Sequence, residues 1–271
     1  MAEQDQYVLG YRSAEQERLQ RQAEELARES RLLFDQFGDL SNQHVVEIGC
    51  GPRGCLDELS RRVGDGGSVI GVERSPEAVA MAREMVGVRG LHNVEVHELD
   101  ARATGLPRDS FDVVTSRLVL VNIPQPEDVV SEALALAKPG GIVAFHEADW
   151  ITHICDPPSE AWSRIGDLFV TYSDRNGIDP YIGRKVPRLV AEAGLTAVTV
   201  IPIVHVYPPG HGRRNILLDF AENLTERFVV DGMIERATLE RIKSSLADDL
   251  ADPNRLVVSH LFFQVWGRKP A

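Results

Sequence analysis

Cysteine is scarce in this chain, and it has neither long apolar runs nor basic clusters. Only three of the 271 residues are cysteines and none forms a C-x-x-C pair, so no disulfide framework is expected. No apolar run reaches the roughly 18 residues that a transmembrane helix needs, and no basic, apolar leader opens the chain. These absences predict a soluble, cytoplasmic protein with no membrane insertion.

The charge balance bears on the class of partner. The formal net charge is −12, and no run rich in lysine or arginine is present. Contacts to phosphates supply much of the affinity for nucleic acids, so we expect a small-molecule substrate and no nucleic-acid partner. The histidines and carboxylates also lack the spacing of common metal sites, and no metal ion is predicted.

The residues that are present suit an ordinary globular protein that can bury a hydrophobic core. Hydrophobic residues make up 43% of the chain and charged residues 26%. Strand-like apolar runs occur at 44–48, 68–72, 94–98, 111–115 and 141–147. Helical patterns separate them at about 54–63, 76–87 and 126–137, and K-P-G-G at 138–141 predicts a sharp stop before the fifth strand. The alternation predicts an α/β fold with a mostly parallel sheet.

The two ends of the chain depart from this alternation. A capping box at 13–16 followed by apolar residues at three-to-four spacing predicts one amphipathic helix over 14–37. The second half shows helical patterns at 159–176, 184–193 and 215–250, and strands at 197–207 and 260–267. We therefore predict three parts: a helical N-terminal cap (1–40), a core (41–207 and 259–271) and a helical lid insertion (208–258).

A glycine-rich loop marks the expected ligand site. The stretch V-V-E-I-G-C-G-P-R-G places Gly49, Gly51 and Gly54 at G-x-G-x-x-G spacing between a strand and a helix. Such a loop brings backbone N–H groups and a helix N-terminus to a ligand. Glu73 ends the second strand, where a carboxylate accepts hydrogen bonds from ribose hydroxyls. Both a dinucleotide and S-adenosylmethionine satisfy this pattern.

Two acidic residues favour S-adenosylmethionine over a dinucleotide. Glu47 lies two residues before Gly49, where an acid would repel a pyrophosphate but attract a sulfonium and an ammonium group. Asp100 ends the third strand, where it can accept a hydrogen bond from an adenine amino group. The expected cofactor is therefore S-adenosyl-L-methionine.

Several motifs follow this loop in a recognisable order: V-I-G-V-E-R-S, the Leu99-Asp100-Ala101 step, F-D-V-V-T-S-R-L-V-L and L-A-K-P-G-G. Together with the glycine loop, over about residues 43–150, they resemble the class I S-adenosylmethionine-dependent methyltransferases. The match is to the small-molecule branch similar to ubiquinone/menaquinone C-methyltransferases. Y-V-L-G-Y near the start and F-F-Q-V-W-G-R-K near the end are similar to its bacterial natural-product members. The resemblance implies a Rossmann-like seven-stranded sheet whose last strand is antiparallel.

The resemblance also implies positions for the cofactor. Along the methionine part it implies Glu47, Gly49, Cys50 and Gly51. At the ribose it implies Glu73, with Arg74 beside it. At the adenine edge it implies Asp100 and Ala101, and at the methionine carboxylate or the substrate it implies Arg117. Tyr7 and Tyr11 precede the first helix, and we predict a cofactor contact for Tyr7 and a catalytic role for Tyr11. Packing of the helix onto the sheet is the alternative for both tyrosines.

The expected general base comes from the polar cluster at the end of the fifth strand. Its candidates are His146, Glu147 and Asp149, each of which has a structural hydrogen-bonding role as its alternative. Trp150, Trp162, Phe169 and Tyr172 suggest an aromatic pocket wall, or equally a helix packed on the sheet, and His205 and Tyr207 face either the lid or solvent.

The predicted function is methyl transfer to a small, largely apolar metabolite of natural-product, isoprenoid or aromatic type, by C- or O-methylation. The alternatives are a non-methylating, cyclase-like enzyme that binds the same cofactor, and an NAD-dependent oxidoreductase. Docking of the first helix on a second subunit would make the protein a homodimer.

Overall fold

The computed structural model describes the chain from residue 13 onward, and its side chains from residue 19 onward except at position 151. The strands of its large sheet are β1 (His44–Ile48), β2 (Ser68–Glu73), β3 (Val94–Glu98), β4 (Phe111–Arg117), β5 (Ala137–Asp149), β7 (Thr196–Ile203) and β9 (Leu261–Arg268). Their order is β3-β2-β1-β4-β5-β9-β7, and β9 runs antiparallel between β5 and β7. The predicted fold class is confirmed: a Rossmann-like, mostly parallel seven-stranded sheet with an antiparallel last strand.

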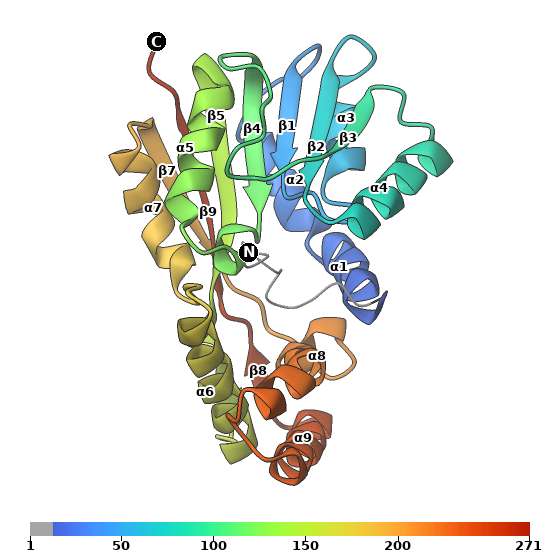
Figure 1. Cartoon of the computed structure of the whole chain (residues 1–271), viewed down its shortest axis with the longest axis vertical. Coiled ribbons are helices and arrows are strands. Elements are labelled where there is room, and N and C mark those ends of the chain that lie inside the picture. The colour runs from blue at the N-terminus through green and yellow to red at the C-terminus, as the bar shows by residue number, and fades with distance from the viewer. Residues whose placement is uncertain (1–12) are drawn as a thin grey trace.

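Helices cover both faces of this sheet (Figure 1). The helices described are α1 (Ser13–Glu25), α2 (Ala27–Asp35), α3 (Leu56–Val63), α4 (Pro76–Arg89), α5 (Pro126–Leu136), α6 (Glu160–Arg175), α7 (Ile182–Glu192), α8 (Ile216–Val230) and α9 (Arg236–Ala251), of which α2, α3, α4, α5 and α7 pack on the sheet. Successive strand residues point to opposite faces, so Val45 packs among residues of α2, α3 and α4 whereas Val46 packs among those of α5 and α7. Both faces are buried, as parallel sheets require.

The N-terminal segment differs from the single helix predicted over 14–37. The helix breaks at Leu26, whose side chain is buried, and the chain continues as α2. Helix α2 lies against the sheet because Leu33 and Phe34 belong to its hydrophobic core, and Gln264 of β9 donates a hydrogen bond to the carbonyl of Glu29. Helix α1 turns away from the sheet toward the lower part of the molecule (Figure 1).

Two further boundaries differ from expectation. Helix α5 ends at Leu136, directly before the K-P-G-G segment, but this segment belongs to β5 and does not precede it. The strand already begins at Ala137, and a register shift against β4 absorbs the irregularity. The helix predicted over 215–250 is two helices, α8 and α9. Gly232 adopts a left-handed conformation (φ 63°) between them, which lets the chain reverse.

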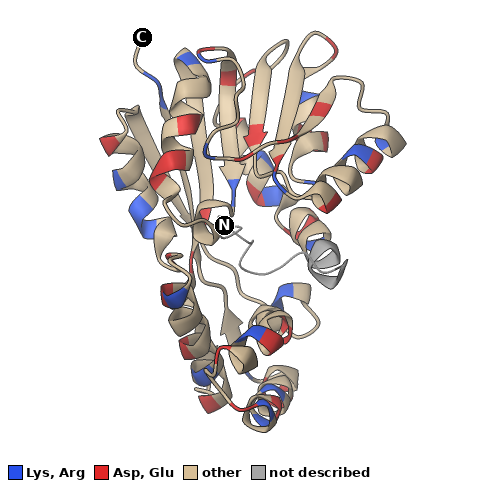
Figure 2. Cartoon of the chain, in the orientation of Figure 1, with Lys and Arg blue, Asp and Glu red and all other residues tan. Residues whose placement is uncertain are grey.

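The lower lobe contains more than the predicted 208–258 insertion. Helix α6 packs on α8 and α9, so it lies with the insertion rather than with the core (Figure 1). A small antiparallel sheet of β6 (Ile154–Asp156) and β8 (Leu256–Val258), which the sequence did not indicate, joins the two segments. Figure 2 shows acidic and basic residues interspersed along these helices. None of the helices described is long and apolar enough to cross a membrane.

Candidate active site

A crevice opens at the carboxyl ends of β1, β2 and β4. The strand order reverses between β1 and β4, and open α/β sheets bind ligands at such switch points. The crevice encloses about 1170 Å³, including the part open to solvent, which is ample for a nucleoside-sized ligand. It is lined by nine of the residues predicted for the cofactor: Glu47, Gly49, Cys50, Gly51, Glu73, Arg74, Asp100, Ala101 and Arg117. Tyr7, the tenth, lies outside the described residues.

The glycine loop turns tightly over the end of β2. The backbone N–H groups of Gly49 and Cys50 both donate to the carbonyl of Val72, at 2.7 and 2.9 Å. Gly49 has a φ of 70°, and a Cβ there would lie 2.2 Å from a methyl carbon of Val119, so the position needs glycine. Burial raises the pKa of the Cys50 thiol well above its usual range, which keeps the thiol protonated.

Glu73 stands at the rim of the crevice with both carboxylate oxygens held. One oxygen accepts a hydrogen bond from the amide of Gly51 at 3.0 Å, and the other accepts from the amides of Arg74 and Ser75 at 2.8 Å. These bonds fix the carboxylate between the glycine loop and the start of α4. A carboxylate placed in this way can accept further hydrogen bonds from a pair of ribose hydroxyls.

Glu47 lies beneath the loop and is 1% exposed. Both of its oxygens accept from the amide of Cys55, at 2.9 and 2.8 Å. Burial raises the pKa of Glu47 to about 7 and outweighs the opposing attraction of Arg117. A cation bound beside Glu47 would therefore favour its ionised form.

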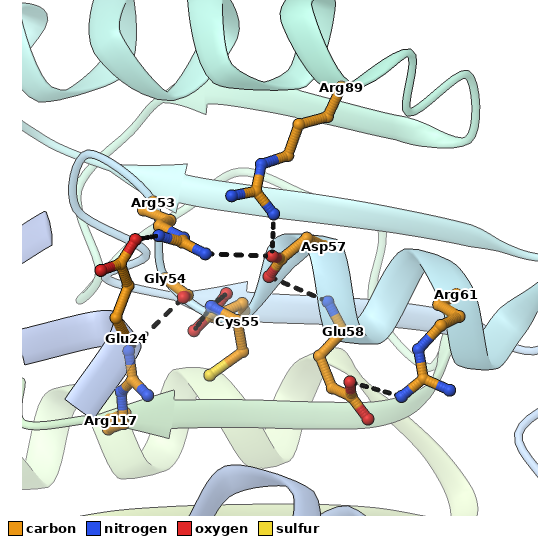
Figure 3. Close-up of polar contacts among 10 residues, drawn as sticks. Glu24, Arg53, Gly54, Cys55, Asp57, Glu58, Arg61, Arg89 and Arg117 are labelled. Atoms are coloured by element: carbon orange, nitrogen blue, oxygen red, sulfur yellow. Dashed lines mark hydrogen bonds and ion pairs between the residues drawn. The ribbon is translucent and has the colours of Figure 1, made fainter. Parts of the chain in front are cut away.

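Arg117, at the end of β4, joins the N-terminal segment to the glycine loop. Its Nη1 donates to the hydroxyl of Ser30 at 2.9 Å, and its Nη2 donates to the carbonyl of Gly54 at 3.4 Å (Figure 3). Arg53 forms a second connection, because it pairs with Glu24 of α1 and lies 3.4 Å from a carboxylate oxygen of Asp57. Arg53, in the outer half of the loop, therefore holds α1 in place.

Asp100 lines the crevice two residues after the end of β3. Its carboxylate accepts from the backbone amide and the guanidinium of Arg102, both at 2.9 Å, and this pairing holds the pKa of Asp100 below its usual range. Leu99 and Ala101 add apolar surface beside it. One ionised acid flanked by apolar side chains suits the edge and face of an adenine ring.

Glu147 and Asp149 hold structural contacts away from the crevice. Glu147 accepts hydrogen bonds from the amides of η1 (Leu120–Asn122) and of the residue before it, at 2.9 to 3.3 Å. Burial raises the pKa of Glu147 to about 7. Asp149 forms an ion pair with Arg184 of α7, with Nη2 2.9 Å from Oδ1. Both carboxylates thus have the structural role that was the alternative to catalysis.

His146 is buried in the sheet between Arg117 of β4 and Gln264 of β9. Neither ring nitrogen has a hydrogen-bond partner among the described residues. Burial lowers the pKa of His146 to about 3, so the ring is neutral at physiological pH. Its ring packs edge-on against Phe262, with centroids 5.4 Å apart, and it lines neither the crevice nor the cavity described next. Tyr11 lies outside the described residues.

A second cavity adjoins the crevice. It occupies about 430 Å³, including the part open to solvent, and shares Leu19, Gln22, Leu118 and Asn122 with the crevice, so the two lie side by side. Leu118 has a φ of 55°, an uncommon conformation for a branched residue and one that often marks a functional position. The η1 segment that follows it is fixed by the Glu147 carboxylate, which therefore positions the junction between the two cavities.

The walls of this second cavity are aromatic. Trp150 packs against Phe169 and Phe220, with ring centroids 4.8 and 4.6 Å apart. Four polar side chains also line it: Gln22 and Asn122 where it meets the crevice, and Arg213 and His260 on its far wall. Arg213 and His260 were missed by the sequence interpretation. The only available signal for His260 was its place at the start of an antiparallel strand, which brings it next to the end of β5.

The remaining sequence candidates lie at different places. Tyr172 packs on Phe228 within the lobe, with centroids 5.6 Å apart, and its hydroxyl accepts from Arg227, so it serves helix packing. Trp162 packs on His153 and faces an outer groove on the far side of Trp150. The pair His205 and Tyr207 lies beside the second cavity without lining it. His205 is 3.6 Å from Glu29, and the Tyr207 hydroxyl accepts from Arg213 at 3.1 Å.

Comparison with curated proteins gives a family match and two informative relatives. A family model described as a methyltransferase domain matches residues 39–194. An uncharacterised 37.1 kDa protein in transposon TN4556 of Streptomyces fradiae is 30% identical over 217 residues, covering 80% of this chain and 61% of that protein. Aklanonic acid methyltransferase DauC from Streptomyces sp. (strain C5) is 30% identical over 115 residues, or 42% of this chain and 52% of that protein. The chain thus spans between half and two thirds of the length of these relatives.

Solved structures share the fold at low sequence identity. Phosphoethanolamine N-methyltransferase 2 from Haemonchus contortus, in complex with S-adenosyl-L-methionine, has a TM-score of 0.58 and 19% identity over 90% of this chain and 53% of that one. The [4+2]-cyclase SpnF has a TM-score of 0.55 and 17% identity over 90% of this chain and 82% of that one. These structures show the fold, and the family match over residues 39–194 with the ordered motifs shows that the chain belongs to the methyltransferase-domain family, among the class I S-adenosylmethionine-dependent methyltransferases.

Proposed function

We propose that this protein transfers a methyl group from S-adenosylmethionine to a small, largely apolar metabolite by C- or O-methylation. The observation that carries the proposal is the position of the aromatic cavity next to the crevice, with Leu19, Gln22, Leu118 and Asn122 lining both. One compartment suits a nucleoside, and the other suits a flat apolar acceptor. Such adjacency is what a transfer reaction requires, because most of its acceleration comes from alignment of the two reactants.

The residues of the crevice fit the cofactor in kind and order. When bound, S-adenosylmethionine supplies a methyl group that its sulfonium has already activated. Glu73 would hold the ribose hydroxyls, Asp100 and Ala101 the adenine edge, and Glu47 the cationic methionine part, with Arg117 near the methionine carboxylate. The close turn at Gly49, Cys50 and Gly51 lets the backbone approach the ligand. Arg74 lies beside the ribose position at the rim.

The raised pKa of Glu47 predicts a pH dependence of cofactor binding. Below about pH 7 the Glu47 carboxyl is protonated and offers no charge to a cation, whereas above that pH it is ionised. Affinity for S-adenosylmethionine should therefore rise by up to about tenfold per pH unit as the pH increases through 7, with release of a proton on binding. Calorimetry at several pH values in buffers of different ionisation enthalpy would measure both quantities.

Glu47→Gln should flatten that profile, because the amide keeps an acceptor for Cys55 but carries no charge. Glu132→Gln is the matched control, since Glu132 is also a buried carboxyl but bonds Thr104 and Arg108 beside α5. An unchanged profile in Glu47→Gln would show that Glu47 does not face the cation.

Methyl transfer itself is tested by following the cofactor and the acceptor together. The chain would be incubated with methyl-labelled S-adenosylmethionine and a panel of small phenols, enols, quinones, aromatic acids and prenyl diphosphates. We expect S-adenosylhomocysteine to accumulate in equal amount with a labelled product. Tighter calorimetric binding of NAD than of S-adenosylmethionine would contradict the proposal and favour an oxidoreductase.

A non-methylating, cyclase-like function is the second candidate, because a solved cyclase shares the fold over most of both chains. It needs the same glycine loop and the same crevice. A product formed with no S-adenosylhomocysteine would favour it over transfer.

Four features of the proposal await their own tests. A cofactor contact by Tyr7 and a catalytic role for Tyr11 stay predictions, as do a homodimer and a cytoplasmic location. The preference for small molecules over nucleic acids rests on the net charge of −12.

A further inference from the structure

We propose that the methyl acceptor is a phenol or enol whose acidic oxygen lies between Arg213 and His260 in the second cavity. This inference rests on the proposed methyl transfer and names the class of its substrate. It follows from the only two ionisable side chains among the described residues that line this largely apolar cavity. Each of the two side chains brings an independent observation.

Arg213 is a buried cation with incomplete compensation. It belongs to η3 (Gly212–Asn215), is 5% exposed, and donates from Nε to the hydroxyl of Tyr207 at 3.1 Å. Among the described residues its Nη1 has no hydrogen-bond partner, and the carboxylate oxygen of Glu25 lies 3.8 Å from it, beyond hydrogen-bond length. A buried guanidinium is costly unless it is paired. An oxyanion in the cavity would supply the missing partner.

His260 is a neutral imidazole on the wall of the same cavity. Its ring stacks on Trp150 with centroids 4.6 Å apart and packs against Phe262 at 4.4 Å, which fixes its plane. The guanidinium of Arg213 also lies over the Phe262 ring, 5.5 Å from its centroid, so the two polar groups are neighbours. Burial, and then the charge of Arg213, lowers the pKa of His260 well below its usual range. The imidazole therefore stays neutral, and its ring N–H can donate a hydrogen bond to an anionic oxygen.

Apart from Arg213, the ionisable side chains among the described residues that act electrostatically on His260 are three histidines. Burial lowers the pKa of each of them, His146, His153 and His205, which favours their neutral forms. Glu29 lies 3.6 Å from His205. Among these groups Arg213 is the cation that lines the cavity.

The transfer step balances in atoms and electrons. The hydroxyl proton of the acceptor passes to solvent as the acceptor binds, and the electron pair of the O–H bond stays on oxygen. Arg213 stabilises that charge by a charge-assisted hydrogen bond, and the N–H of the neutral His260 donates a second one. The oxygen bonds to the methyl carbon while the electron pair of the methyl–sulfur bond stays on sulfur. Where the conjugated ring carbon is methylated instead, the proton of that carbon then leaves and the oxygen takes up a proton.

A chromogenic phenol tests the inference directly. The probe is 4-nitrophenol, whose ionised form absorbs visible light, titrated with the full chain saturated with S-adenosylhomocysteine. We expect the bound probe to have a pKa at least about one unit below that of the free probe, so its phenolate binds at least tenfold more tightly than its phenol. The non-ionisable 4-nitroanisole should bind more weakly than the phenolate.

Variants separate the contributions. Arg213→Gln should abolish the pKa shift of the probe, Arg213→Lys should retain part of it, and His260→Asn should reduce it. Arg188→Gln, which removes an exposed guanidinium paired with Glu192 on α7, is the control and should change nothing. Unaltered affinity for S-adenosylhomocysteine would show that each variant is folded.

Two outcomes overturn the inference. In the first, measured on the wild-type chain alone, 4-nitrophenol has the same pKa when bound as when free, or its phenolate binds no more tightly than 4-nitroanisole. The other is a shift that persists in folded Arg213→Gln. If S-adenosylhomocysteine itself fails to bind, the proposed function fails, and that result is distinct from loss of the phenol preference alone.

Discussion

Replacing Glu73 with alanine should weaken binding of S-adenosylmethionine by on the order of 2–3 kcal/mol, or roughly 30- to 150-fold in Kd. The carboxylate would lose its charge-assisted bonds to the ribose hydroxyls. In addition, the amides of Gly51, Arg74 and Ser75 would lose their common acceptor, so the rim of the crevice would loosen. Isothermal titration calorimetry on purified protein gives the change directly.

Two further variants show whether the effect comes from the carboxylate at this position. Glu73→Gln keeps one acceptor oxygen but removes the charge, so its affinity should fall between those of the wild type and Glu73→Ala. Glu98→Ala removes an exposed acid that is paired in register with Glu73 on the neighbouring strand but does not line the crevice. Its affinity should equal that of the wild type. Equal affinities in all three variants would contradict the ribose assignment.

The cofactor half of the site could be predicted because its information is local. The run of β-branched residues into Gly49, the acid at Glu73 and the step at Asp100 each lie within a few residues of a strand end. Parallel strands then bring those ends to one edge of the sheet. Because βαβ units place consecutive parallel strands next to one another, the spacing and type of the residues along the chain are sufficient to predict which of them line the crevice.

The acceptor half depends on contacts that no local pattern encodes. His260 reaches the cavity because β9 inserts antiparallel beside β5, and Arg213 reaches it from a short 3-10 turn after the last edge strand. The candidates at Glu147 and Asp149 were correctly placed at a strand end. Their neighbours decided their roles, because η1 amides bind one carboxylate and Arg184 binds the other.

Helix α6 shows the same limit on a larger scale. Its residues carry a clear helical period, so the helix was predicted, but periodicity does not say which surface it buries. In the structure Phe169 joins the aromatic cavity while Tyr172 packs within the lobe. The small sheet of β6 and β8 joins the two segments of the lobe. Its strands of three residues are too short to show the alternation of apolar and polar residues that predicts a strand.

A deletion series should divide the N-terminal segment into a part that closes the site and a part that holds the fold. Removing residues 1–25 takes away α1, whose Leu19 and Gln22 line both cavities and whose Glu24 pairs with Arg53. The sheet and α2 are untouched. We expect a folded protein whose affinity for S-adenosylhomocysteine is lower by about tenfold, from the apolar and polar cover that is lost.

Removing residues 1–38 should instead unfold the protein, contrary to a view of the whole segment as a detachable cap. That deletion takes away Leu33, Phe34 and Phe37, which are buried against the sheet, and burial of each such side chain stabilises by about 1.5–3 kcal/mol. Their sum is comparable to the roughly 5–15 kcal/mol that stabilises a whole domain. Circular dichroism on heating would show a cooperative transition for the shorter deletion and none for the longer one.

Removing only residues 1–12 completes the series, because it deletes Tyr7 and Tyr11 and leaves α1 in place. An affinity equal to that of the wild type would assign the closing role to α1 alone. An affinity as low as that of the 1–25 deletion would assign it to the segment that carries the two tyrosines. A cooperative transition in the 1–38 deletion would show that the sheet folds without α2. That result would contradict the structural importance of two contacts, Phe34 under Arg62 of α3 and Phe37 against Trp266 of β9.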